Sequence, residues 1–257
     1  MSWLGRIFSS KGSAEQRMAD AVAAWKAGEY GVALDLWAPL AHRGLARAQS
    51  NMGAAFLEGR GVERDPDKAA LWLRRAAEQG DVGGQRNLAL CYYEGWGVPQ
   101  DHLEAARWYE KAAAQGDPEA QDTLSWMKLL GGGCPQDYPG AIAWAEKAAA
   151  HGRVAAMARL GDMHHNALGV ERDATLATQW WRRAALLGHP EAQAMLGAAY
   201  LAGQGVPRDP VEALHWLLRG EAGGAGELAA GFLREARAHT KASQRAEAER
   251  RAAEPLP

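Results

Sequence analysis

A spacing of 36 residues runs through most of this 257-residue sequence. Five tryptophans follow this spacing, at Trp72, Trp108, Trp144, Trp180 and Trp216. Six glycines do the same, at Gly44, Gly80, Gly116, Gly152, Gly188 and Gly224. Several residue types share this single period, which chance does not produce. A period of this length is typical of a solenoid, a propeller or another tandem array.

The repeat predicts two helices in each of five units, 45–80, 81–116, 117–152, 153–188 and 189–224. We number the positions of each unit from 1 to 36. A small residue at position 4, Leu or Met at position 8 and a larger side chain at position 12 fall on one helical face. A glycine-rich turn follows, then an aspartate at position 21 that suits a helix start. The second helix carries Ala at position 25 and Trp at position 28, and ends at the glycine of position 36. Two helices leave no room for strands, so we expect an all-α chain.

This pattern resembles the Sel1-like repeat family, which is related to the tetratricopeptide repeat. The first unit shows the resemblance in Ala48, Met52-Gly53, Gly59-Arg-Gly-Val62, Asp65 and Trp72. The resemblance implies an α-solenoid with a right-handed superhelix and a protein-binding groove. We expect no cofactor and no metal.

The regions outside the five units are expected to differ from them. Residues 1–13 are expected to be a flexible start and 14–44 a degenerate helix pair. Residues 225–240 are expected to form a capping helix, with Leu228 and Phe232 at core positions 4 and 8. The charged tail 241–257 is expected to be either helical or disordered.

Composition excludes several classes of protein. The formal net charge is −2, so the chain lacks the basic field of a nucleic-acid binder. Two cysteines cannot build a disulfide framework. The apolar start is too short for a signal peptide, and no stretch is long enough to span a membrane. We expect a cytoplasmic protein, with a weak membrane anchor at Trp3, Leu4, Ile7 and Phe8 as the alternative.

A binding face is predicted on the first helices, at positions 3, 6, 10, 13 and 14, away from the 4/8/12 face. The resemblance implies that this face lines the groove. Apolar candidates in the second and third units are Leu90, Tyr93, Trp126, Leu129 and Leu130. Polar candidates around them are Arg86, Asp122, Asp162, His165 and Asn166. The alternative is that the apolar side chains pack against the next unit.

Catalytic motifs have weak support in this sequence. Ser125-Trp-Met-Lys128 matches the Ser-x-x-Lys of penicillin-interacting enzymes, but the accompanying Ser-Asp-Asn and Lys-Thr-Gly motifs are absent. Asp162 and His165 could share a metal only with a third ligand, and none is apparent.

We therefore expect a scaffold or adaptor, not an enzyme, that binds a partner protein or peptide in the groove. Self-association is possible, and nucleic acid is not expected. The alternatives are a toxin-neutralising immunity-type protein and a β-lactamase-like hydrolase. We also expect each repeat tryptophan to be a core residue, so that Trp144→Ala costs about 3–5 kcal/mol.

Overall fold

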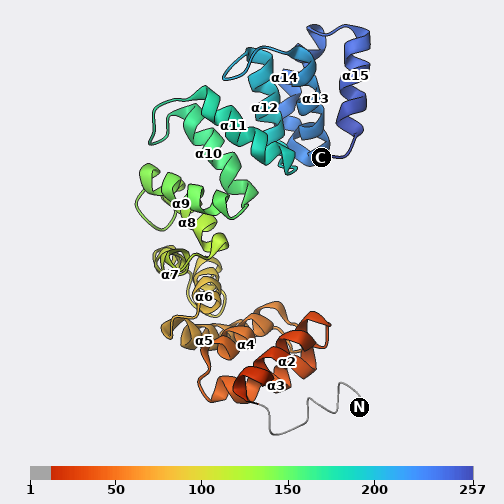
Figure 1. Ribbon diagram of the computed structural model, residues 1–257. Coiled ribbons are helices and arrows are strands. Elements are labelled where there is room, and N and C mark those ends of the chain that lie inside the picture. Colours follow the sequence, from red (N-terminus) through yellow and green to blue (C-terminus); the bar gives the residue numbers. More distant parts are fainter. Residues whose placement is uncertain (1–12, 257) are drawn as a thin grey trace. The chain divides into compact units, whose positions relative to one another are not determined.

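The computed structural model describes residues 13–256 as consecutive helices, without a strand in that range (Figure 1). The first helices of the five repeats are α4 (Ala46–Glu58), α6 (Val82–Glu94), α8 (Pro118–Leu130), α10 (Val154–Asn166) and α12 (Pro190–Ala202). The second helices are α5 (Pro66–Glu78), α7 (His102–Ala114), α9 (Tyr138–Ala150), α11 (Ala174–Leu186) and α13 (Pro210–Gly220). The chain is an α-solenoid of tandem helix pairs, as its sequence predicts.

Further helices flank the five repeats. Before them come α2 (Ala14–Lys26) and α3 (Tyr30–His42). After them come a π-helical turn (Glu221–Ala225), α14 (Gly226–Ala238) and α15 (Ala242–Ala253). The membrane anchor considered at Trp3, Leu4, Ile7 and Phe8 lies outside the described residues.

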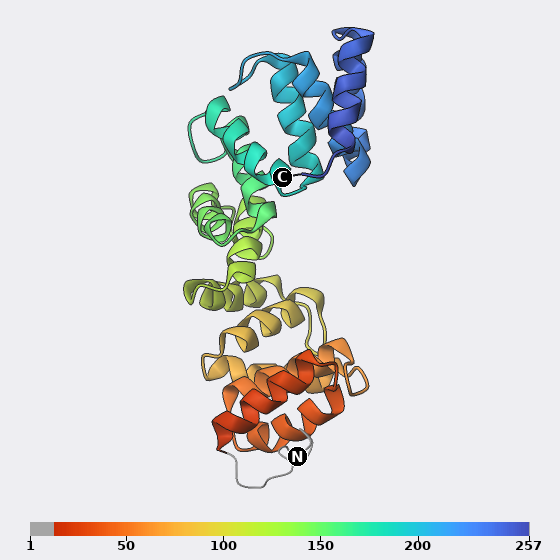
Figure 2. The same cartoon turned by 45° about the vertical axis from the view of Figure 1, so that its right-hand side comes forward.

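The described chain forms two compact units. The first unit holds residues 13–124 and Gly132–Pro135, and the second holds Ser125–Gly131 and residues 136–256. In the first unit, α4 packs on α5, α5 on α6 and α6 on α7. In the second unit, α10 to α13 pack in the same successive order, and α15 lies along α13 (Figures 1 and 2). Each helix pair thus covers the apolar face of the pair beside it.

The helix ends follow the predicted turn chemistry. The aspartate at position 21 accepts a backbone N–H at the start of every second helix; these residues are Asp65, Asp101, Asp137, Asp173 and Asp209. The period-36 glycines all have positive φ, from 82° at Gly152 to 111° at Gly224. In the first four repeats a carboxylate cap and a left-handed glycine at opposite ends fix the length of the second helix, whereas α13 of the fifth repeat ends at Gly220, before Gly224.

The glycine at position 17 is needed for a second reason. Gly97 has φ +67°, and a Cβ there would overlap the backbone carbonyl of Pro66, in the preceding second helix. Gly205 meets Ala174 in the same way. The turn of one repeat therefore lies directly on the helix start of the repeat before it, and only glycine allows this approach.

The predicted core face is confirmed at positions 4, 8 and 25. Position 4 is buried in all five repeats, and so are Met52, Leu88, Leu124, Leu160 and Leu196 at position 8. The alanines at position 25 are all 0% exposed. Cys91 is also fully buried, as predicted, and burial raises the pKa of its thiol to about 11.

The tryptophans at position 28 are core residues in only two repeats. Trp72 and Trp216 are buried, whereas Trp108, Trp144 and Trp180 are half-buried. In the half-buried cases a cation from position 31 covers the ring, with Lys147 Nζ 4.0 Å from the Trp144 centroid. The expectation of five core tryptophans is therefore wrong in the middle repeats.

The deeper core position is position 29, one residue later. Its occupants are Leu73, Tyr109, Ala145, Trp181 and Leu217, and all of them are at most 4% exposed. In three repeats the residue at position 29 faces a glycine at position 9 of the first helix, as Leu73 faces Gly53 and Leu217 faces Gly197. Large and small side chains thus alternate across the helix pair, as close packing requires.

A row of buried glutamines joins successive helix pairs. At position 5, Gln49, Gln85, Gln121 and Gln193 each donate a hydrogen bond to the carbonyl eight residues earlier, over 3.0–3.3 Å. Each such carbonyl lies near the end of the preceding second helix. Without this bond the buried amide of the glutamine would lose its acceptor, whereas the carbonyl would keep the N–H of the glycine three residues after it.

The expected register of the last helix is wrong. Leu228 and Phe232 are 40% and 36% exposed, whereas Ala229 and Leu233 are buried. The π-helical turn that leads into α14 explains the shift, because it winds the chain differently from the turns between the other repeats. Its Gly224 has a φ of 111°. Phe232 is thereby displaced from the core to the surface.

Candidate binding surface

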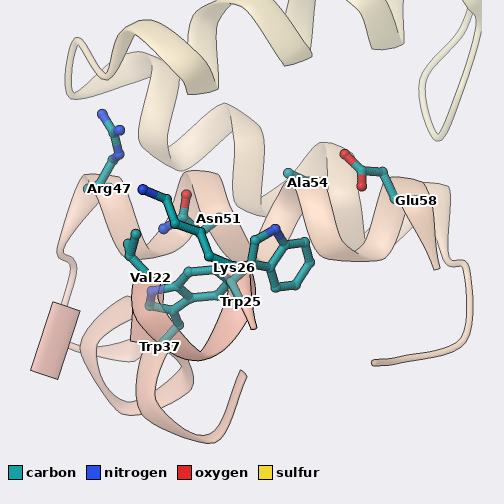
Figure 3. Close-up of a pocket in the computed structure, with 8 residues that line it drawn as sticks. All are labelled: Val22, Trp25, Lys26, Trp37, Arg47, Asn51, Ala54 and Glu58. Carbon is teal, nitrogen blue, oxygen red and sulfur yellow. The ribbon is translucent and has the colours of Figure 1, made fainter. Parts of the chain in front are cut away.

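A pocket of about 230 Å³ lies among α2, α3 and α4 of the first unit (Figure 3). We call it the N-terminal pocket. It is lined by Val22, Trp25, Lys26, Trp37, Arg47, Asn51, Ala54 and Glu58. The four α4 residues occupy positions 3, 7, 10 and 14, which share one helical face. This pocket therefore uses the helix face that the repeat does not need for its core.

Two indoles form the apolar part of the N-terminal pocket. The ring centroids of Trp25 and Trp37 are 5.2 Å apart, and Tyr30 packs edge-on behind Trp25 at 4.7 Å. Trp37 is only 3% exposed, and its Nε1 has no hydrogen-bond acceptor within residues 13–256. The packed rings give the pocket a rigid aromatic wall.

The charged side chains of the same pocket include two cations and one carboxylate. Lys26 and Arg47 are exposed, and neither forms an ion pair within residues 13–256. Glu58 is paired with Arg60 at 2.8 Å. A second hollow of about 430 Å³ shares Val22, Lys26 and Arg47 and extends along α2 to Met18. The two cations therefore stand between two apolar hollows.

The second unit has its own pocket, of about 160 Å³, on the same face of its first helices. We call it the C-terminal pocket. It is lined by His165, Trp181, Met195, Ala198, Ala199, Ala202, Gln204 and Phe232. Phe232 reaches it because of the shifted register of α14. Three of these eight residues stand on the predicted binding face: His165 at position 13, Ala198 at position 10 and Ala202 at position 14.

The polar residues predicted in α10 form one connected group beside this pocket. Asp162 Oδ1 accepts a hydrogen bond from Trp181 Nε1 at 2.9 Å, and the His165 ring lies 5.2 Å from the Trp181 ring. Asn166 donates to the backbone carbonyl of Asp162. Desolvation by the surrounding protein raises the pKa of the Asp162 carboxyl above its usual range. These groups hold the indole of Trp181 in place next to the pocket.

The residues predicted in the first unit are less exposed than expected. Arg86, Leu90 and Tyr93 are half-buried. Arg86 pairs with Asp117 at 3.2 Å and with Glu119 at 3.4 Å, while the Tyr93 ring packs against His102.

Asp122 was expected to be exposed, and this expectation is wrong, because the residue is only 6% exposed. It occupies position 6, where Ser50, Ala158 and Ala194 are also buried. Position 6 thus belongs to the packed side of the first helix.

The apolar residues predicted in α8 divide into two groups. Trp126 and Leu130 are exposed, at 38% and 57%. Leu129 is half-buried and packs against the core of the second unit, as the alternative interpretation holds. Exposure on the first helices is therefore concentrated at positions 10 and 14 and is smaller at position 13.

The catalytic interpretation of Ser125 and Lys128 has no geometric basis. Ser125 is 0% exposed at position 9, and its Oγ accepts a hydrogen bond from Arg159. Lys128 Nζ bonds Asp137 at 3.2 Å. Within residues 13–256, three or more metal-ligating side chains do not gather anywhere. In the same range, every helix is too short or too polar to cross a membrane.

The Sel1 repeat model matches this chain five times in succession, over 46–81, 82–117, 118–152, 154–189 and 190–224. The chain belongs to the Sel1 repeat family. The matched segments agree with the helix pairs described above, and Sel1 repeats generally mediate protein–protein interaction. No curated protein matches the sequence significantly.

Solved structures share the same Sel1 fold. A Sel1 repeat protein from Oxalobacter formigenes is 29% identical with a TM-score of 0.76, over 86% of this chain and 96% of that one. A protective antigen of uropathogenic Escherichia coli is 24% identical with a TM-score of 0.79, over 98% of this chain and 64% of that one. An immunity protein from Pseudomonas aeruginosa is 20% identical, over 82% of this chain and 84% of that one. Its TM-score of 0.42 is too low to support an argument about function.

Both pockets contain residues that the sequence analysis did not select. Trp25 and Trp37 stand in the degenerate helix pair, which the predicted binding face did not include, and Trp37 lies one residue past the tryptophan place of the 36-residue period. Asn51 and Met195 stand at position 7, which was not on the predicted face. Position 7 lies three residues before position 10 and seven before position 14, so it shares their helical face. Adding position 7 to the predicted face would have identified both Asn51 and Met195.

Proposed function

We propose that this Sel1 repeat chain binds a partner protein or peptide through the exposed face of its first helices. The observation that carries the proposal is the place of the two pockets. Both lie on this face, one in each unit, and both combine aromatic rings with small or polar side chains. Family membership supports protein binding in general, and the pockets support this face in particular.

Exposed apolar side chains at the open positions support the same proposal. Trp126 at position 10 and Leu130 at position 14 lie one turn apart on α8 and expose 38% and 57% of their surface. Tryptophan is among the side chains that contribute most binding energy in protein interfaces. We propose that these two side chains contact the partner.

Affinity capture with matched variants tests this proposal. The variant Trp126→Ala with Leu130→Ala removes apolar surface from the first-helix face. The variant Leu71→Ala with Leu103→Ala removes two leucines of similar exposure, 50% and 49%, from second helices. We expect a captured partner to be lost from the first variant and retained by the second. The reverse result would move the binding surface to the second helices.

An adaptor role in the cytoplasm, without catalysis, is part of this proposal. The buried Ser125 and the Lys128–Asp137 pair argue against the hydrolase alternative. The toxin-neutralising alternative has no separate support among these observations. A partner that proves to be an enzyme inhibited on binding would favour it.

A further inference from the structure

We propose that the N-terminal pocket takes an acidic segment of a partner protein, with a bulky apolar side chain inserted beside the indoles. This inference rests on the proposed function and specifies the chemistry of the partner at one site. It follows from three features of the pocket. These are its aromatic wall, its two cations, which form no ion pair among the described residues, and its buried donor, which has no acceptor among them.

The aromatic wall determines which side chain would enter. Trp25, Trp37 and Val22 present ring and methyl surface to the pocket (Figure 3). The small Ala54 at position 10 leaves room where α8 carries Trp126 instead. An aromatic or large aliphatic side chain would cover this surface and bury it from water.

The charges determine what flanks that side chain. Lys26 and Arg47 border both the N-terminal pocket and the hollow along α2. Neither has a carboxylate partner within the described residues, and the nearby Glu58 is held by Arg60. A segment with carboxylates on either side of its apolar side chain would complement these cations, whereas a basic segment would be repelled.

The buried donor favours the same kind of ligand. The Nε1 of Trp37 has no acceptor in the part of the chain that the structure describes, which is costly for a buried N–H group. A carboxylate or backbone carbonyl oxygen from the segment would supply one after a small shift of the side chains that cover it. Asn51, on the α4 wall, offers a further amide for the backbone of an extended segment.

The chain's own first residues do not fit this pocket electrostatically. Residues 1–12 contain Arg6 and Lys11 and no acidic residue. Their charge opposes that of Lys26 and Arg47 bordering the pocket. A partner segment of opposite charge is therefore the better occupant.

Fluorescence anisotropy with three labelled peptides tests the inference on the full chain. The probes are Gly-Ser-Glu-Phe-Asp-Glu, its basic counterpart Gly-Ser-Lys-Phe-Arg-Lys, and Gly-Ser-Glu-Ala-Asp-Glu, which lacks the ring. We expect the first peptide to bind at least about tenfold more tightly than either of the others. Equal binding of the three, no binding, or a preference for the basic peptide would overturn the inference. A preference for the basic peptide would point to the chain's own residues 1–12 as the occupant.

A charge-reversal variant locates the site. Lys26→Glu with Arg47→Glu changes two exposed residues that hold no ion pair, so we expect the fold to be unchanged by circular dichroism. This variant should bind the acidic peptide at least about tenfold more weakly than the wild type does, and it should bind the basic peptide more tightly than the acidic one. The control, Arg234→Glu with Arg237→Glu on the exposed side of α14, makes the same charge change in the other unit. Undiminished binding of the acidic peptide by the first variant, or an equal loss in both, would overturn the assignment.

The peptide-binding experiment and the affinity-capture experiment test different residues, so one can fail while the other succeeds. Failure of the acidic peptide would remove the assignment of this pocket alone. Capture of a partner through Trp126 and Leu130 would be decided independently, because those residues belong to the other unit.

Discussion

Gly161 lies against the indole of Trp181, so closely that a Cβ on the glycine would overlap the ring at Cδ1 and Nε1. The glycine is at position 9 of its repeat and the tryptophan at position 29. This is the largest side chain at position 29 in the five repeats, and it faces the smallest residue. The pair thus shows how one repeat accommodates a bulky core residue within a fixed backbone.

Gly161→Ala should destabilise the protein by about 2–3 kcal/mol, because the added methyl group forces the indole or the helix to move. Gly231→Ala, in α14, is the matched control, since its Cβ would meet no atom within 4 Å. We expect the control to be neutral or stabilising by up to about 1 kcal/mol, through helix propensity. Urea unfolding measures both. Equal effects of the two substitutions would contradict the close contact.

Ala167→Gly should stabilise the protein by about 1 kcal/mol. Ala167 ends α10 with φ 57°, and it is the one non-glycine residue with positive φ in residues 13–256. The other repeats place Gly59, Gly95, Gly131 and Gly203 at this point. Left-handed backbone strains a residue with a Cβ but not glycine. Thermal unfolding of Ala167→Gly beside Gly203→Ala should show opposite shifts, and shifts of the same sign would refute this explanation.

Trp181→Ala should cost more than Trp144→Ala. The ring of Trp181 is 2% exposed, and its loss should cost about 3–5 kcal/mol, as for other large core truncations. Trp144 is half-buried under Lys147, so we now expect about 1–3 kcal/mol for its removal, less than the sequence suggested. Chemical denaturation of the two variants decides between these expectations. A greater loss for Trp144→Ala would restore position 28 as the main core position.

Acid should weaken the attachment of α15 to α13 through His215. This histidine is 5% exposed, and desolvation, with the nearby Arg251 of α15 as a smaller cause, lowers its pKa below 6.5. Arg219 of α13 lowers it further, while Glu212 opposes the shift. Since the folded protein holds the ring neutral, its contribution to stability is present above pH 6.5. It is lost as the pH falls below that value.

The variant His215→Leu isolates this effect. We expect wild type to lose more unfolding free energy than the variant between pH 7 and pH 5, because the variant cannot be protonated at this site. Parallel pH profiles for the two proteins would show that His215 does not titrate in this range. The Arg251–Glu212 ion pair, at 2.8 Å, is present in both proteins, so its own pH dependence cancels when the two profiles are compared.

The helix pairs could be predicted from the sequence because particular residue types occur at the helix ends. Asp at position 21 and Gly at position 36 specify where the second helix begins and ends, and both do so through local backbone geometry. The depth of burial could not be predicted in the same way. Whether Trp144 or Ala145 faces the core depends on how neighbouring helices rotate, and adjacent residues on a helix differ by only 100°.

The candidate site was predicted only in part for the same reason. Open positions 10 and 14 were correctly identified at Trp126 and Leu130, whereas position 6 proved to be packed at Asp122. Phe232 was misplaced because a π-helical turn interrupts the period before α14. Trp37 lies in the degenerate helix pair, one residue past the tryptophan place of the period, and the predicted face was drawn only on the five regular repeats. The 36-residue period alone could therefore not identify the pocket residues at which the chain departs from it.

The row of buried glutamines has one gap, at Met157, where the fourth repeat places a thioether instead of an amide. The other glutamines each tie a first helix to the end of the helix pair before it. In an array held together by nearest neighbours, opening starts where one interface is weaker than the rest. The interface between α10 and the end of α9 is therefore expected to open first during local unfolding. Hydrogen exchange of the backbone amides should be fastest at this interface.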